Sequence, residues 1–138
     1  MTADDVIHLL DLKPHSEGGF FRETFRDSAE VNGRSRSTAI YYLLRAGEIS
    51  CWHRIDAVEI WHWYAGDALE LKSGEGADFE RTVLGSDLSG GHVPQHTVPA
   101  RFWQSARSLG AYTLVGCTVA PGFEYSGFEL APPGWEPG

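Results

Sequence analysis

The sequence has no long hydrophobic run. Its longest stretch without a charged residue, from Ser108 to Phe123, is interrupted by three glycines and a proline, whereas a membrane-spanning helix needs about 20 predominantly apolar residues. The segment from Met1 to Leu12 contains three aspartates and no lysine or arginine, so we expect no signal peptide. These absences predict a cytoplasmic protein that does not enter a membrane.

Cysteine is equally scarce. Cys51 and Cys117 are the only two, and they form neither a Cys-x-x-Cys pair nor the framework of a disulfide-rich domain. Small secreted domains usually depend on several disulfides, whereas intracellular proteins keep their thiols reduced. We therefore expect a reduced, intracellular protein.

Basic residues are outnumbered. The sequence has 11 Lys and Arg residues against 19 Asp and Glu residues, which gives a formal net charge of −8 at pH 7. That charge repels phosphate backbones, so we expect no nucleic-acid partner. The sequence also lacks a phosphate-binding loop, a dinucleotide fingerprint and a serine nucleophile elbow. A few arginines can still make the electrostatic potential inside one pocket positive, so a small anionic ligand is not excluded. The candidates are Arg22, Arg26, Arg34 and Arg36, and we select Arg22 as the residue that contacts the ligand.

The residues that are present indicate a folded chain. With 138 residues, 42% of them hydrophobic, and 5 Trp, 5 Tyr and 7 Phe, the composition is that of a globular protein and excludes a disordered or fibrous one. The length suits one domain, because two separate cores would each be too small to bury enough apolar surface. We predict one domain over residues 1–138 with its core in about 12–131.

Periodicity predicts an all-β domain with a short helical start. Thr2 is a suitable N-cap for a helix with acidic residues in its first turn, and Pro14 would end it. Short alternating or β-branched segments follow, at the spacing of a sandwich or barrel. They are residues 20–26, 38–44, 48–55, 58–64, 68–72, 79–84, 96–99, 102–106, 111–119 and 128–131.

One segment carries the clearest functional pattern. Gly47, His53, Glu59 and Gly66 have the spacing of the first motif of the cupin superfamily, G-x5-H-x-H-x3-E-x6-G, except that Ile55 replaces the second histidine. On a strand, residues two apart face the same side, and the returning strand brings the glutamate across from them. The pattern therefore predicts that His53 and Glu59 meet inside a barrel.

A second, degraded motif lies downstream. Pro99 matches the proline of G-x5-P-x-G-x2-H-x3-N, and Gln104 stands where this motif has its histidine. Val93, Arg101 and Ser108 replace its two glycines and its asparagine.

Further segments narrow the resemblance. Residues 12–21, 37–44, 52–54, 59–62, 98–100 and 119–124 are similar to the single-domain Cupin 5 branch, whose members are mostly of unknown function. The resemblance covers residues 12–131 and implies a cupin double-stranded β-helix, or jelly-roll barrel, that commonly forms a homodimer. It implies no particular reaction.

The chemistry of His53 and Glu59 leaves three interpretations of their role open. With Gln104 they could bind a divalent metal such as Ni, Mn, Fe or Zn weakly, since such sites normally need three protein ligands and Ile55 cannot ligate. They could act without metal as a base and its acidic partner, with Gln104 as an orienting group. They could also only bond to one another or to water. His96, near the second motif, is a candidate for a missing ligand.

Other residues could line a pocket beside this pair. Alternation places Trp61 and Trp63 on the face of Glu59, where they could form an aromatic wall for a flat or sugar-like ligand or simply belong to the core. Ile60, His62 and Tyr64 would then face the other side, where a dimer contact is possible. Alternation also places Cys51 on the face of His53.

The loop Glu17-Gly18-Gly19 allows a sharp turn or a close approach of the backbone to a ligand.

Together these patterns favour a protein that binds a small polar or aromatic metabolite in its barrel, with isomerase, epimerase or lyase chemistry carried by His53 and Glu59. The epimerase suggestion rests on analogy with metal-free cupin epimerases of nucleotide sugars. The alternatives are a metal-dependent oxygenase and a metabolite-binding protein without catalysis.

Overall fold

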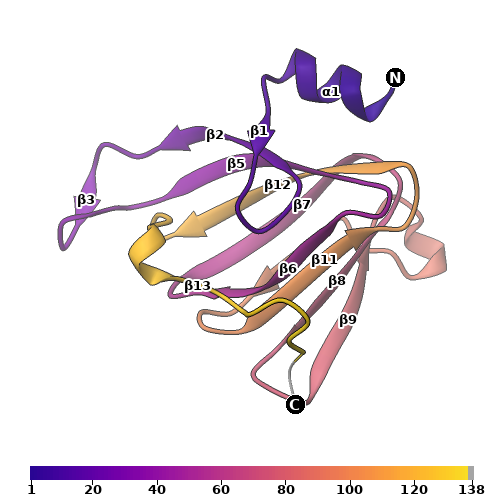
Figure 1. The fold of residues 1–138 in the computed structure, drawn as a ribbon. Helices are drawn as coiled ribbons and strands as arrows, with labels where there is room; N and C mark the ends of the chain where they lie inside the picture. Colours follow the sequence, from indigo (N-terminus) through magenta and orange to yellow (C-terminus); the bar gives the residue numbers. More distant parts are fainter. Residues whose placement is uncertain (137–138) are drawn as a thin grey trace.

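The computed structural model, which describes residues 1–136, consists almost entirely of short strands after one helix (Figure 1). In chain order the elements are α1 (Ala3–Leu9), β1 (Lys13–Pro14), β2 (Phe20–Arg26), β3 (Glu30–Val31), β4 (Arg34–Ser35), β5 (Thr38–Arg45), β6 (Ile49–Ile55), β7 (Val58–Gly66), β8 (Leu69–Gly74), β9 (Phe79–Leu84), η1 (Leu88–Gly90), β10 (Gln95–Val98), β11 (Trp103–Ser108), β12 (Tyr112–Ala120), η2 (Tyr125–Gly127) and β13 (Phe128–Leu130). The predicted segments agree with these strands to within a few residues. The two-residue strands β1, β3 and β4 and the two 3₁₀ turns were not predicted.

Most strands form two facing antiparallel sheets (Figure 1), and β3 and β4 form a separate two-stranded sheet. Of the two facing sheets, one has the order β1-β2-β5-β12-β7-β10 and the other β13-β6-β11-β8-β9. Consecutive strands such as β5 and β6 lie in different sheets, so the chain winds back and forth between the two layers. This arrangement confirms the predicted all-β jelly roll with a short N-terminal helix.

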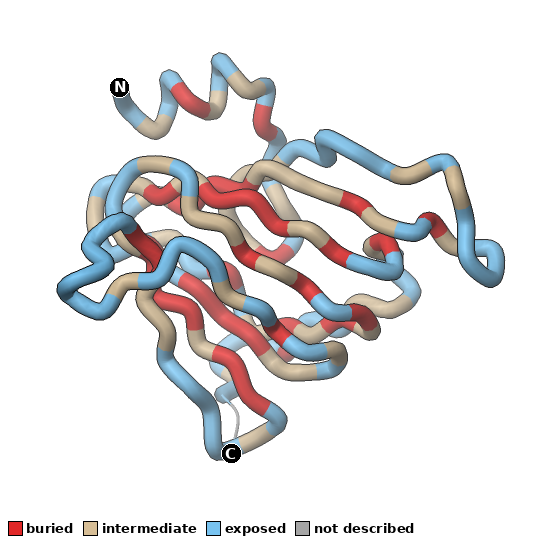
Figure 2. The backbone as a smooth tube through the Cα atoms, turned by 180° about the vertical axis from the view of Figure 1, so that it is seen from behind, coloured by how far each residue is buried: buried red, intermediate tan, exposed pale blue. Residues whose placement is uncertain are grey.

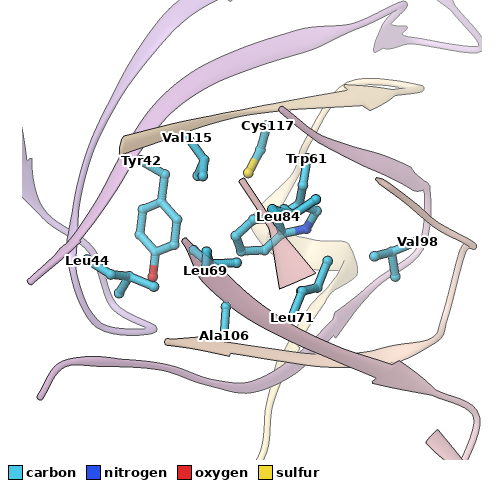
Figure 3. Packing of buried hydrophobic residues seen from close by; sticks show 10 residues of the cluster. All are labelled: Tyr42, Leu44, Trp61, Leu69, Leu71, Leu84, Val98, Ala106, Val115 and Cys117. Atoms are coloured by element: carbon cyan, nitrogen blue, oxygen red, sulfur yellow. The ribbon is translucent and has the colours of Figure 1, made fainter. Parts of the chain in front are cut away.

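The hydrophobic core fills the space between the sheets. Figure 2 shows that the buried backbone runs along the central strands, whereas the helix and the outer loops are largely exposed. The main cluster gathers large side chains from both sheets (Figure 3): Tyr42, Leu44, Trp61, Leu69, Leu71, Leu84, Val98, Ala106, Val115 and Cys117. Trp61 of this cluster also supports the polar site described below, through a hydrogen bond to Gln104.

The N-terminal helix is fixed at its start by the predicted cap. The Thr2 hydroxyl accepts a hydrogen bond from the Asp5 N–H, and the Asp5 carboxylate accepts one from the Thr2 N–H. Such reciprocal capping satisfies two backbone donors that a helix otherwise leaves unpaired. The apolar face of α1 then packs through Val6 onto Leu43 of β5. Neither α1 nor any other helix within residues 1–136 has the length and apolar character that crossing a bilayer demands.

Candidate functional site

A bulge in β6 determines which of its side chains point inward. His53 pairs with Gln104 of β11 and Ser50 pairs with Ala106, so two residues of β6 lie opposite the single residue between these partners on β11. Ser50 and His53 are therefore both buried, whereas Cys51 is exposed. The expectation that Cys51 shares the face of His53 is wrong, because the extra residue breaks the two-residue alternation of the strand.

The same bulge frees the backbone of Cys51 for two contacts that build the site. Its N–H donates to the carbonyl of Glu17 at 2.8 Å, and its carbonyl lies 2.7 Å from Nδ1 of His53. A carbonyl can only accept, so Nδ1 carries a hydrogen and the lone pair of a neutral His53 is on Nε2. The bulge thus sets both the position of Glu17 and the tautomer of His53.

The loop before β2 brings Glu17 beside that lone pair. Gly18 has φ +109°, and a Cβ at this position would collide with the backbone carbonyl of Ile49, so only glycine lets the loop lie against β6. Oε2 of Glu17 lies 3.1 Å from Nε2 of His53, and Oε1 accepts a hydrogen bond from the Ser50 hydroxyl at 3.1 Å. Both Glu17 and His53 are buried. Glu17 is a site residue that the sequence reasoning missed, although its two glycines marked the loop.

One proton must lie between Glu17 and His53, because two bare acceptor atoms do not approach so closely. Burial raises the pKa of Glu17, and burial likewise lowers the pKa of His53. Desolvation therefore favours two neutral partners, with the proton on Glu17 and directed at Nε2. Such a pair can pass a proton either way with a small movement.

Glu59 is the second buried carboxyl at the site. Its Oε1 accepts a hydrogen bond from Nε2 of Gln104 at 2.8 Å, and Oε1 of Gln104 accepts one from the Trp61 indole at 2.8 Å. The indole can only donate, so it fixes the amide with its NH₂ group towards Glu59. Burial raises the pKa of Glu59 to about 7, against smaller opposing effects of His53 and Gln104. Glu59 can thus give or take a proton near neutral pH.

These groups lie in a cavity of about 560 Å³ between β2, β5, β6, β7, β12 and the segment around η2. The cavity is lined by His15, Glu17, Phe21, Glu23, Arg26, Thr38, Ile40, His53, Ile55, Glu59, Cys117, Val119, Phe123, Glu124, Tyr125, Ser126 and Phe128. Phe128 stacks on the His53 ring, with centroids 5.6 Å apart and planes 28° apart. The cavity therefore has an acidic and imidazole-bearing part next to an aromatic part, a combination typical of sites for small organic molecules.

Of the predicted site residues, His53 and Glu59 line this cavity, whereas Trp61, Trp63 and Gln104 do not. Trp61 and Gln104 are completely buried behind Glu59 and hold it through the hydrogen bonds above. The Trp63 indole donates to the carbonyl of Asp67 at 3.0 Å. Neither tryptophan forms the expected aromatic wall of the pocket. Phe123, Tyr125 and Phe128 take that position instead.

Arg22 also lies away from the cavity. It donates to the Leu10 carbonyl at 2.9 Å, and its guanidinium lies over the Tyr41 ring. Arg22 lies between Phe21 and Glu23, which both line the cavity, so regular alternation turns it to the opposite face. A bulge follows in β2, where Glu23 pairs with Ile40 and Phe25 with Ala39, which leaves the residue between them unpaired. The inward face therefore passes from Glu23 to Arg26, and Arg26 lines the cavity in place of Arg22.

The residues present do not fit a three-ligand metal site. Within residues 1–136, no group of three or more His, Cys, Asp or Glu side chains is arranged to hold a metal ion. Gln104 directs its amide NH₂ towards Glu59 and its carbonyl oxygen to Trp61, so it offers the site no ligand atom. His96 lies in a different depression, beside the β8–β9 loop, and cannot complete the set.

Comparison with known proteins gives one family and a set of similar structures. The family model described as Cupin_5, "Cupin superfamily (DUF985)", matches residues 4–131. A crystal structure of a Shewanella oneidensis protein is 37% identical, with 95% of this chain and 85% of that chain covered and a TM-score of 0.91. A hypothetical protein from Leishmania major is 30% identical, with 95% and 88% covered and a TM-score of 0.90.

More distant structures share the fold alone. Oxalate decarboxylase from Bacillus subtilis is 14% identical, with 88% of this chain and 30% of that chain covered and a TM-score of 0.66. None of the curated proteins matches the sequence significantly.

Proposed function

This chain belongs to the Cupin_5 family of the cupin superfamily, and we propose that it binds a small metabolite with polar and aromatic parts in its cavity and transfers a proton on it. The observation that carries the proposal is the buried contact of Nε2 of His53 with Oε2 of Glu17, 3.1 Å apart, at a cavity that Glu59 also lines. Proton transfer is the step shared by isomerisation, epimerisation and elimination, the reaction types predicted from the sequence.

Each polar residue has a distinct part in this proposal. His53 accepts a proton through Nε2, because Nδ1 is bound to the Cys51 carbonyl. Glu17 supplies or receives the proton at Nε2, and Ser50 holds its other oxygen. Glu59, oriented by Gln104, is the second acid or base, positioned to act on a different part of the ligand. The His53–Glu17 pair and Glu59 line one cavity, so protonation and deprotonation of a ligand can take place in one site.

The test begins with a ligand. We suggest screening the full chain against a library of small metabolites by ligand-observed NMR, then incubating each bound compound in D₂O. Exchange of a carbon-bound hydrogen for deuterium would support proton transfer. Binding without exchange of any compound would favour the alternative of a metabolite-binding protein without catalysis. A chain that binds no compound at all would refute the proposal.

The metal-dependent alternative makes its own prediction at Ile55, which is buried and lines the cavity two residues after His53. We expect weak binding of divalent metals by the natural chain and at least about tenfold tighter binding, or about 1.4 kcal/mol, after Ile55→His, because a second imidazole would join His53 and Glu59. Calorimetric titration with Ni(II), Mn(II) and Zn(II) measures both. Ile49→His, on the exposed face of the same strand, is the control. Equal affinities of the natural chain and Ile55→His would mean that residue 55 does not reach the site.

We also propose that the protein forms a homodimer. The β3–β4 hairpin extends away from the two sheets (Figure 1). Val31 in this hairpin and Phe25 near the end of the preceding strand β2 are each 52% exposed. A two-stranded ribbon is only marginally stable alone, so a second protomer covering its apolar side chains would stabilise it.

Light scattering tests this assembly. We expect a mass of about 30.4 kDa, twice the protomer mass of 15.2 kDa, at micromolar concentration. Phe25→Asp should shift the mass towards 15.2 kDa, whereas Leu88→Asp, an equally polar change at an exposed leucine of η1, should not. A single protomer mass for the natural chain would contradict the proposal.

The proposed location of the protein is the cytoplasm. Its two cysteines are free, which supports a reducing compartment.

A further inference from the structure

The acidic groups that line the cavity outnumber the permanently charged basic ones. Four carboxyls line it, those of Glu17, Glu23, Glu59 and Glu124, against one guanidinium, that of Arg26. Arg26 is already engaged: its Nε and one terminal nitrogen donate to the two carboxylate oxygens of Glu23 at 2.9 and 2.8 Å, and it also donates to the Phe123 carbonyl. No free cation therefore faces an incoming anion among the described lining residues.

The two imidazoles do not change this balance. Burial lowers the pKa of His15 and of His53, so both rings are neutral at pH 7. A phosphate or carboxylate ligand would find only Arg26 as a cation in the lining, and Arg26 is already paired with Glu23. Binding an anion there is unfavourable in a site shielded from water.

The aromatic part of the cavity has the geometry of a corner. The Phe123, Tyr125 and Phe128 rings stand at 72° to 82° to one another, with centroids 4.9 to 5.9 Å apart. Because the three planes are close to mutually perpendicular, a group seated against them meets the face of at least one ring. Ring faces carry the negative end of the aromatic quadrupole and attract cations. Glu124, next to Tyr125, lines the same surface, and its carboxylate lies 3.4 Å from Nε of Arg34.

We propose that this cavity selects a small organic cation, an ammonium or comparable onium group seated against Phe123, Tyr125 and Phe128 with the acidic groups around it. This inference rests on the proposed function, since it names the class of ligand for the same cavity. It departs from the anionic, nucleotide-sugar type of ligand that the epimerase analogy would imply.

Three compounds of nearly equal shape isolate the charge: choline, 3,3-dimethylbutan-1-ol, which is neutral, and 3,3-dimethylbutanoate, which is an anion. We suggest titrating each into the full chain and following the backbone amide signals of residues 121–128 by NMR. We expect choline to bind at least about tenfold more tightly than the alcohol and the anion more weakly than both. Alcohol or anion binding as tight as choline would refute the cation inference but leave the proposed function intact. Failure of all three, together with an empty metabolite screen, would refute both.

The aromatic contribution is tested by the ratio of affinities rather than by affinity alone. Tyr125→Leu keeps an apolar side chain but removes a ring face, so the ratio of choline to alcohol affinity should fall by at least about threefold. Tyr64→Leu is the matched control, because Tyr64 is similarly exposed (50% against 60%) and does not line the cavity. If Tyr125→Leu only disturbs the structure, it should weaken the binding of choline and of the alcohol equally and leave the ratio of their affinities unchanged. That result would contradict the proposed contact of the cation with the ring face.

Glu59 supplies an independent readout. A bound cation favours the carboxylate form of a neighbouring carboxyl, so choline binding at pH 7 should release a proton from Glu59, and the binding heat should vary with the ionisation enthalpy of the buffer. Glu59→Gln should remove this variation, whereas Glu75→Gln, the same change at an exposed residue of the β8–β9 loop, should retain it. Buffer-independent heats for the natural chain would place the cation away from Glu59 and overturn the proposed arrangement.

Discussion

Replacing His53 with asparagine is expected to slow deuterium exchange on a bound ligand by at least about a hundredfold, the lower end of what a positioned acid or base contributes. Asparagine has no lone pair basic enough to accept the proton that Glu17 presents to Nε2. The substitution also keeps a polar side chain that can still donate to the Cys51 carbonyl, as Nδ1 does now. The measurement is the NMR signal of the exchanging hydrogen in D₂O, followed over time.

Two further variants distinguish the chemistry from damage to the fold. Glu17→Gln retains an acceptor for the Ser50 hydroxyl but holds an amide, which has no transferable proton, at Nε2 of His53. It should therefore also slow exchange strongly while binding the ligand. His8→Asn, at an exposed histidine of α1, should leave the rate unchanged. If His53→Asn exchanges as fast as the natural chain, the base lies elsewhere and Glu59 becomes the first candidate.

The parts of the site that could be predicted are those that depend on local spacing. Gly47, His53, Glu59 and Gly66 recur at intervals set by two strands and their turn, and the side chains of His53 and Glu59 do face inward. The strands themselves followed from β-branched and aromatic segments separated by turn residues. These features need no knowledge of distant contacts.

The parts that could not be predicted depend on bulges and on long-range packing. One extra residue in β6 moved Cys51 to the exterior, and one in β2 turned Arg26 towards the cavity. A bulge is decided by pairing with a neighbouring strand, so alternation within one strand cannot reveal it. Glu17 contacts His53 from a loop that lies 36 residues earlier in the chain (53 − 17). Its two glycines indicated a close approach but not its target.

Glu59 gives the largest expected effect on stability. Its pKa of about 7 in the folded protein lies above the ordinary value of 4.5, so the folded state holds a proton that the unfolded chain has released between these values. The stability this carboxyl contributes is therefore complete below pH 4.5 and is lost as the pH rises through 7. At about 1.4 kcal/mol per pH unit, the loss amounts to about 3 kcal/mol of unfolding free energy.

Glu59→Gln removes this loss, because an amide at this position resembles the protonated acid and can still accept from Nε2 of Gln104. We expect the unfolding free energy of the variant to exceed that of the natural chain by up to about 3 kcal/mol at pH 8 and to match it closely at pH 4.5. Urea unfolding across this range, at one protomer concentration, measures the difference. The buried histidines change stability in the opposite sense, since their lowered pKa values cost stability as the pH falls below 6.5. The contribution of His15 is common to both proteins, whereas the Glu59 carboxylate raises the pKa of His53, so these two groups titrate together in the natural chain.

Glu75→Gln provides the control for charge removal, since Glu75 is exposed and should change the unfolding free energy by no more than about 0.5 kcal/mol at any pH. A constant difference between Glu59→Gln and the natural chain across the range would mean that Glu59 titrates normally and cannot act as the neutral-pH acid. A difference that grows with pH would identify Glu59 as a carboxyl held protonated at a cost in stability. Such a cost is typical of groups retained for function, because the protein would be more stable with an amide in the same place.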